Sequence, residues 1–293
     1  MSRITKSILP LIAVAAGVAY WQSAPATVDE NTYAALSGDA SAGEGIFIAG
    51  GCASCHAAPD AQDKTLLSGG QAFPSDFGTF YAPNISPSDA GLGGWSLTEF
   101  ASALTLGTGR QNEHLYPAFP YTSYVKMEPQ QVADLYAYMQ TLPVSDTPSL
   151  PHDVQFPFNI RRGIGLWKAL FLENGYVVAD LPDGVTARGR ELVETLAHCA
   201  ECHTPRNALG ALDRERWMAG APNPSGQGNI PGLTPAQLDW SAADIAYYLE
   251  TGFTPDFDSV GGHMAAVVDN FAQLSAADRE AVAAYIKALP AAE

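Results

Sequence analysis

Two short motifs combine cysteine and histidine at a spacing that suits the covalent attachment of haem. Each has the pattern Cys-x-x-Cys-His, and together they contribute Cys52, Cys55, His56, Cys199, Cys202 and His203. On a helical turn, side chains three and four positions apart lie on one face. Both thiols can therefore reach the two vinyl groups of one porphyrin, and the histidine can bind its iron. The spacing predicts a c-type haem at each motif.

A single Cys-x-x-Cys pair is also compatible with a chance match, a zinc knuckle or a thioredoxin-like redox pair. The chain contains 4 cysteines, and the two motifs use all of them. No cysteine is left for a zinc site or a structural disulfide. We therefore expect two covalently attached haem c groups.

A second axial ligand, typically Met or His, usually completes an electron-transfer haem. In the later half of the chain, Met264 follows two glycines and precedes the last expected helix, where a loop can fold back over the haem. We predict Met264 as the sixth ligand of the second haem. We expect Met218 to be a core residue, His263 to be exposed, and His198 to lie on the wrong side of the motif.

The earlier half has Phe119 near the place that matches Met264. The nearest methionine is Met127, just before an expected helix, and we predict it as the sixth ligand of the first haem. Met127 aligns with Leu274 in the later half, where a packing role at a helix start is expected. His114 is the second candidate, and an open or water-filled site is the third.

The elements that position these residues recur at a nearly constant offset. The first cysteines of the motifs are 147 positions apart, Trp95 and Trp240 are 145 apart, and Tyr138 and Tyr285 are 147 apart. Each unit shows helical patterns, long loops and no convincing strand pattern. Helices are expected at 41–51, 95–106, 129–142, 189–197, 240–252 and 276–289. The chain is therefore predicted to be all-α, with duplicated domains at 41–145 and 184–293.

Residues 1–26 resemble an export signal or an amino-terminal membrane anchor. Arg3 and Lys6 precede an apolar, uncharged segment of 14 residues from Ile8 to Trp21. This length fits a signal peptide, and the wider stretch 7–26 is just long enough to span a bilayer. We favour an uncleaved anchor. Either alternative places the rest of the chain in the bacterial periplasm.

Two further segments connect these parts. Residues 27–40 are small and polar and are expected to form a linker. Residues 146–183 are expected to form an ordered connector that contains an apolar run from Ile164 to Leu172. Arg161 and Arg162 in this connector are either haem propionate partners or surface residues.

Composition limits the partners. Lys and Arg total 15 against 31 Asp and Glu, which gives a net charge of −16. This charge argues against nucleic acid as a partner. It is compatible with steering towards a basic protein surface, and equally with a role in solubility alone.

The chain resembles a known family on three stretches, which are 77–85, 115–121 and 201–207 (FGTFYAPNI, LYPAFPY and ECHTPRN). They are similar to di-haem cytochromes c of the class I type, including the cytochrome subunits of bacterial membrane-bound alcohol, aldehyde and sugar-acid dehydrogenases. The resemblance implies two tandem class I cytochrome c folds, each wrapped around a covalent haem. It also implies His56 and His203 as proximal ligands and Met264 as a distal ligand. Some relatives carry Met where this chain has Phe119.

Two functions are compatible with these features. The first is electron transfer from a dehydrogenase or quinol-linked donor to a terminal oxidase or another cytochrome. The second is a di-haem redox enzyme, peroxidase-like or thiosulfate dehydrogenase-like, with an open or weakly ligated first haem. No substrate pocket, nucleophile or acid–base pair stands out, and we expect an electron carrier or an electron-transfer subunit rather than an enzyme.

Overall fold

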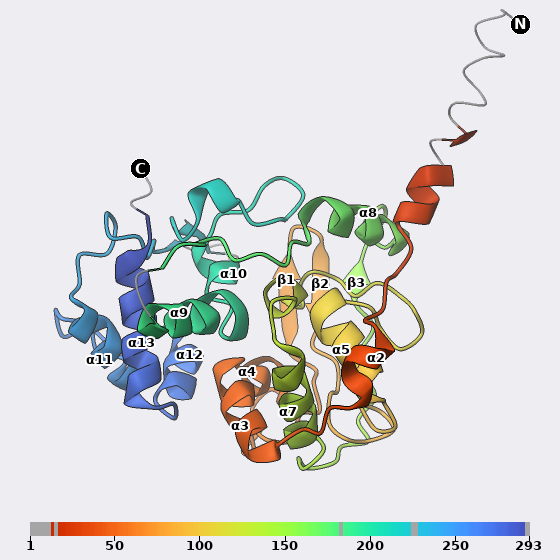
Figure 1. The fold of residues 1–293 in the computed structure, drawn as a ribbon, viewed down its shortest axis with the longest axis horizontal. Helices are drawn as coiled ribbons and strands as arrows, with labels where there is room; N and C mark the ends of the chain where they lie inside the picture. Colours follow the sequence, from red (N-terminus) through yellow and green to blue (C-terminus); the bar gives the residue numbers. More distant parts are fainter. Residues whose placement is uncertain (1–12, 15–16, 182–183, 224–227, 291–293) are drawn as a thin grey trace, which may run out of the picture.

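The computed structural model describes residues 13–14, 17–181, 184–223 and 228–290. The chain forms two mostly helical units that lie side by side, with a connector above them (Figure 1). Most of the predicted signal or anchor segment lies outside the described residues. Among the residues that are described, no helix is long and apolar enough to cross a membrane.

The first unit contains six helices and two strands within the described residues. They are α2 (Glu30–Ala34), α3 (Ala40–Ala49), α4 (Cys52–His56), β1 (Ala72–Ser75), β2 (Gly78–Tyr81), α5 (Leu97–Leu106), α6 (Tyr121–Tyr124) and α7 (Pro129–Met139). The connector adds β3 (Asp153–Val154) and α8 (Arg162–Phe171).

The second unit repeats much of this order. It contains α9 (Gly184–Glu191), which continues into a π-helical turn (Leu192–Leu196), then α10 (Ala200–His203), a 3-10 turn (Arg214–Arg216), β4 (Ala221–Pro222), β5 (Asn229–Ile230), α11 (Ala242–Thr251), α12 (Met264–Phe271) and α13 (Ala276–Ala288).

In each unit the helix that leads to the motif crosses the last helix at a glycine. A Cβ atom on Gly43 of α3 would lie 2.0 Å from the carbonyl oxygen of Asp134 in α7. A Cβ atom on Gly189 of α9 would lie 1.9 Å from the carbonyl oxygen of Ala281 in α13. Any larger residue would push the helices apart, so glycine allows the close packing that holds each unit together.

The middle helix of each unit begins with a capping box. In α5 the Ser96 side chain accepts from the Glu99 amide while the Glu99 side chain accepts from the Ser96 amide, and Ser241 and Asp244 do the same in α11. These reciprocal bonds satisfy amides that a helix start leaves without partners.

Small strands are the main difference from the predicted architecture. Strands β1 and β2 pair antiparallel, and β3 of the connector extends the sheet along β2. Strands β4 and β5 form a second antiparallel pair. Because they are short and largely uncovered, these strands show no alternating apolar pattern that the sequence could reveal.

Residues 27–40, expected to be a linker, contain α2 and pack against the first unit. The Tyr33 side chain is buried in the core, and a Cβ atom on Gly38 would lie 2.1 Å from the carbonyl oxygen of Ala133. The buried ring and backbone contacts such as the bond from the Asp39 amide to Asp134 fix this segment, although most of its residues are small and polar.

Candidate functional site

Each Cys-x-x-Cys-His motif forms one tight helical turn that follows a residue with left-handed backbone. Gly51 precedes Cys52 with φ of 59°, and His198 precedes Cys199 with φ of 41°. The turns of α4 and α10 then bring the two cysteines and the histidine of each motif together. The structure therefore places each set of predicted attachment residues on one compact surface.

The histidine of each motif is oriented by a proline carbonyl. His56 Nδ1 lies 2.9 Å from the oxygen of Pro83, and His203 Nδ1 lies 2.8 Å from the oxygen of Pro231. Because a carbonyl only accepts, Nδ1 carries the proton in each ring, and Nε2 is left as the iron-binding nitrogen. Burial lowers the pKa of both histidines, which favours the neutral, metal-binding form.

The surroundings of the cysteines differ from those of a reactive thiol pair. None of the four forms a disulfide, and burial raises the pKa of Cys52 and of Cys199 to about 12. Reactive thiol pairs instead have a lowered pKa. In the described parts of the chain, no three His, Cys, Asp or Glu side chains gather to hold a metal ion.

Comparison with known proteins identifies the family. The cytochrome c family model matches residues 40–143 and again residues 186–290. The chain belongs to the cytochrome c family. The two matched ranges each contain one motif, so the prediction of two cytochrome c domains with two covalently bound haem c groups is confirmed. His56 and His203, which are predicted as proximal ligands, and their proline partners fit this cofactor.

Several relatives are named as cytochromes or cytochrome subunits. The chain is 53% identical to a protein of Cereibacter sphaeroides named diheme cytochrome c-type, and the match covers 100% of both chains. It is 38% identical to the fructose dehydrogenase cytochrome subunit of Gluconobacter japonicus, over 86% of this chain and 52% of that subunit. It is 31% identical to the alcohol dehydrogenase (quinone) cytochrome c subunit of Gluconobacter oxydans, over 96% of this chain and 59% of that subunit. The cytochrome thus spans about half the length of these two dehydrogenase subunits.

Met264 is the first residue of α12, and its side chain is partly buried against the main core. Gly262, two residues earlier, has left-handed backbone with φ of 59° that turns the chain into this helix. His263 is exposed and Met218 is fully buried, as expected from the sequence. Ligation of the second haem iron by Met264 stays a prediction.

Met127 lies directly before Glu128, the N-cap of α7, and is buried in the main core. Val132, at the fourth position of the helix, belongs to the same core cluster. These are the two positions of a hydrophobic staple, and Leu274 holds the equivalent place before Ser275 and α13. The structure thus gives Met127 a packing role, and its ligation of the first haem stays a prediction.

His114, the second candidate for the first haem, is engaged elsewhere. Its Nε2 lies 2.9 Å from the carbonyl oxygen of Ser23, and Nδ1 is buried without a partner among the described residues. Burial lowers the pKa of this histidine. Phe119, in the loop before α6, packs its ring against those of Tyr121 and Tyr124.

The two motifs face each other across the domain interface. Ser54 of the first motif accepts a hydrogen bond from Asn270 of α12, at 3.0 Å. Glu201, which holds the same place in the second motif, accepts one from Thr122 of α6, at 2.7 Å. Burial raises the pKa of Cys55, and the nearby Cys202 thiol raises it further. Each motif is therefore held against the opposite domain.

His198 adds a third contact at this interface. Its Nε2 lies 3.3 Å from the carbonyl oxygen of Gly50, and its ring packs edge-on against Tyr124 at 5.8 Å between centroids. The sequence places His198 on the wrong side of the motif for a ligand and gives no sign of this contact. The contact depends on how the two domains pack, which no local pattern indicates.

Arg161 and Arg162 bind backbone and hydroxyl oxygens, and their pairing with haem propionates stays a prediction. Arg161 donates to the carbonyl of His114, and Arg162 donates to the carbonyl of Tyr20 and the hydroxyl of Ser23. Their role is therefore to fix the connector and the amino-terminal segment on the first domain.

Proposed function

We propose that this di-haem cytochrome c passes electrons between a dehydrogenase or quinol-linked donor and a terminal oxidase or another cytochrome, in the bacterial periplasm. The observation that carries the proposal is that each haem-attachment motif is hydrogen-bonded to the opposite domain. Ser54 and Glu201 hold matching positions, and each bonds to the opposite domain. This arrangement keeps the two attachment sites adjacent.

The haem groups supply one-electron transfer when bound. The chain holds each imidazole through a proline carbonyl, which fixes the ring and increases its basicity as a ligand. It also fixes the spacing of the sites through interface bonds that include a buried carboxylate. Burial raises the pKa of Glu201, but Arg206 and Thr122 outweigh this effect, so the net pKa is lowered. Glu201 is therefore ionised at neutral pH and binds both partners.

The kind of donor is proposed from the relatives. Proteins 38% and 31% identical to this cytochrome are named as cytochrome subunits of fructose dehydrogenase and of quinone-dependent alcohol dehydrogenase. A dehydrogenase subunit is accordingly the donor we propose. The net charge of −16 would favour a basic surface on the partner.

One observation favours a second candidate function, that of a redox enzyme. Phe119 stands near the place where Met264 stands in the second domain, and a phenylalanine side chain has no donor atom that could bind the first iron. An iron with an open position could bind peroxide or another small substrate. The two functions differ in how the reduced protein reacts with a partner cytochrome and with peroxide.

The holo-protein, reduced and freed of reductant, is mixed in a stopped-flow instrument with an oxidised soluble cytochrome c or with hydrogen peroxide. The carrier function predicts that both haems are oxidised rapidly by the cytochrome and that peroxide produces no sustained turnover. Sustained peroxide reduction with an electron donor present, at a rate above that of free haem, would contradict the proposal.

A further inference from the structure

An apolar face lies on α8 and on the loop before it. Leu166 and Leu170, one helical turn apart, are 40% and 66% exposed. The loop contributes Phe156, Phe158 and Ile160, with exposures of 78%, 46% and 52%. We call these five residues the α8 face. Large apolar side chains exposed together usually mark a binding surface rather than a solvated one.

The charged side chains of this segment are bound by groups of the protein. Residues 154–172 contain no Asp or Glu, although the chain has 31 of them. Lys168 donates to the carbonyls of Leu106 and Gly107, and Arg161 donates to the carbonyl of His114. Burial lowers the pKa of Lys168 to about 8. The face can therefore enter an apolar medium without exposing an unpaired charge to it.

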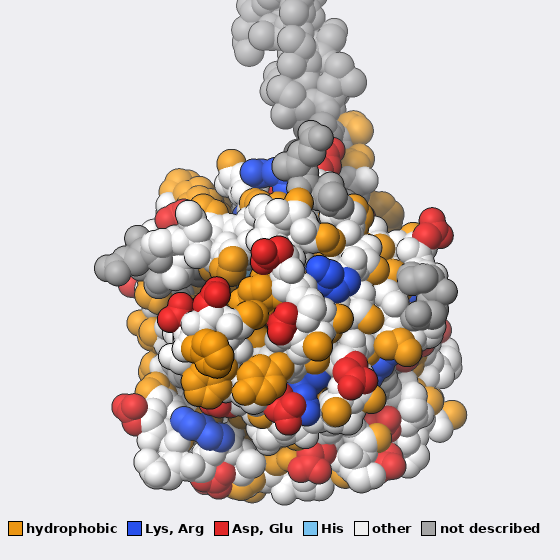
Figure 2. Space-filling model, turned by 90° about the vertical axis from the view of Figure 1, so that its left-hand side faces the viewer, with side chains coloured by type: hydrophobic (Ala, Val, Ile, Leu, Met, Phe, Trp, Pro, Cys, Tyr) orange, Lys and Arg blue, Asp and Glu red, His pale blue; other side chains and the backbone are white. Residues whose placement is uncertain are grey.

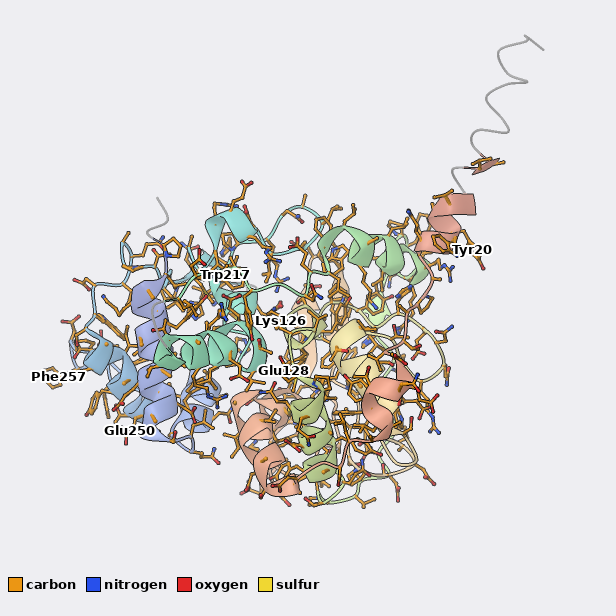
Figure 3. The ribbon with its side chains drawn as sticks, viewed as in Figure 1. Tyr20, Lys126, Glu128, Trp217, Glu250 and Phe257 are labelled. Atoms are coloured by element: carbon orange, nitrogen blue, oxygen red, sulfur yellow. The ribbon has the colours of Figure 1, made fainter. Side chains whose placement is uncertain are left out.

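The amino-terminal segment is fixed against the same helix. Arg162 donates to the carbonyl of Tyr20 at 2.5 Å and to the hydroxyl of Ser23 at 2.9 Å, and its guanidinium lies 4.2 Å from the Tyr20 ring centroid. Gly165 of α8 approaches Ser23 so closely that a Cβ atom would lie 2.3 Å from the Ser23 carbonyl oxygen. Tyr20 lies beside α8 at the end of the molecule opposite Phe257 (Figure 3).

We propose that the α8 face rests on the surface of a lipid bilayer, next to the point where the apolar segment Ile8–Trp21 enters it. The inference builds on the amino-terminal anchor that the sequence predicts. Tyr20 and Trp21, at the end of that segment, are 69% and 76% exposed and are the residue types that favour the membrane interface. Because Arg162 holds this end of the segment on α8, a bilayer that receives the segment meets the α8 face as well.

Photo-crosslinking of the full-length holo-protein tests the proposal. Phe156→p-benzoylphenylalanine places a photoreactive group on the α8 face, and Phe257→p-benzoylphenylalanine, at a position 91% exposed, is the matched control. Both proteins are bound to vesicles of phosphatidylcholine and phosphatidylglycerol, irradiated and analysed by mass. We expect a lipid adduct at position 156 and at least ten-fold less at position 257.

Two other outcomes distinguish a failure of the α8 face from a failure of the anchor. Vesicle flotation without a lipid adduct at position 156 would overturn the proposal and leave the anchor intact. Failure to float with vesicles would overturn the anchor and the proposal together, whereas the electron-transfer function would stand. Leu170→Glu should lower the adduct at position 156 several-fold, and Phe257→Glu should not change it. An unchanged adduct in Leu170→Glu would contradict the role of the α8 face.

Discussion

At the residue scale, each predicted haem site depends on a histidine and on the proline carbonyl that orients it. The sequence indicates the histidine but not the proline. The motif spacing identifies His56 and His203 because the chemistry requires histidine directly after the second cysteine. Their partners, Pro83 and Pro231, lie 2.9 and 2.8 Å away but 27 and 28 positions later in the chain. No local pattern connects such distant positions, so these partners could only come from the structure.

Met264 gives a prediction for the second haem. Replacing it by alanine should abolish the methionine–iron charge-transfer band of one ferric haem and lower the midpoint potential of that haem, because a methionine ligand raises the potential. The other haem should keep its potential. Near-infrared absorption and a potentiometric titration measure both effects. Survival of every methionine–iron signature in Met264→Ala would show that the assignment is wrong.

Met127 gives the corresponding prediction for the first haem. Leucine preserves the volume of this buried position, so Met127→Leu should cost less than about 1.5 kcal/mol of folding free energy. If the ligand prediction is right, the variant loses the methionine–iron band of the first haem. A variant with an unchanged spectrum would leave Met127 with the packing role alone, as at Leu274.

At the scale of elements, the helices followed from the sequence more readily than the strands. Helix starts such as Ser96 with Glu99 have a recognisable capping pattern, and Gly107 at the end of α5 has left-handed backbone with φ of 60°. Phe80 is the one buried residue of strands β1 and β2. A single buried residue gives no alternating pattern that would predict a strand. Their pairing with β3 depends on the connector folding back onto the first domain.

The glycine crossing between α3 and α7 gives a stability prediction. Gly43→Ala should destabilise the first domain by about 3 kcal/mol, because the added methyl group would overlap the Asp134 carbonyl. Gly45→Ala is the matched control in the same helix, since nothing lies within 4 Å of its added Cβ. The control should be neutral or stabilise by up to about 1 kcal/mol. Urea unfolding followed by circular dichroism compares them, and equal effects of the two substitutions would contradict the packing role of Gly43.

The two capping boxes predict equal losses in both domains. Ser96→Ala and Ser241→Ala each remove a side-chain acceptor from a helix start, which should cost about 1 kcal/mol. Thermal unfolding of each holo-variant against the parent protein measures the loss. A loss of stability in only one of the two variants would show that the capping boxes do not stabilise both domains equally.

At the scale of the whole molecule, duplication was predictable but the domain arrangement was not. The constant offset between repeated landmarks indicated two domains, whereas the bonds of Asn270 and Thr122 to the opposite motifs arise only after both domains have folded. Asp and Glu side chains are spread across the end formed by the second domain (Figure 2).

The spin state of the ferric holo-protein tests the central claim of electron transfer most directly. Electron paramagnetic resonance and absorption spectra should show two low-spin, six-coordinate haems, and cyanide added at moderate concentration should change neither quickly. A high-spin ferric component that binds cyanide or peroxide readily would show an open iron at one site. That result would contradict the carrier function and favour the redox enzyme.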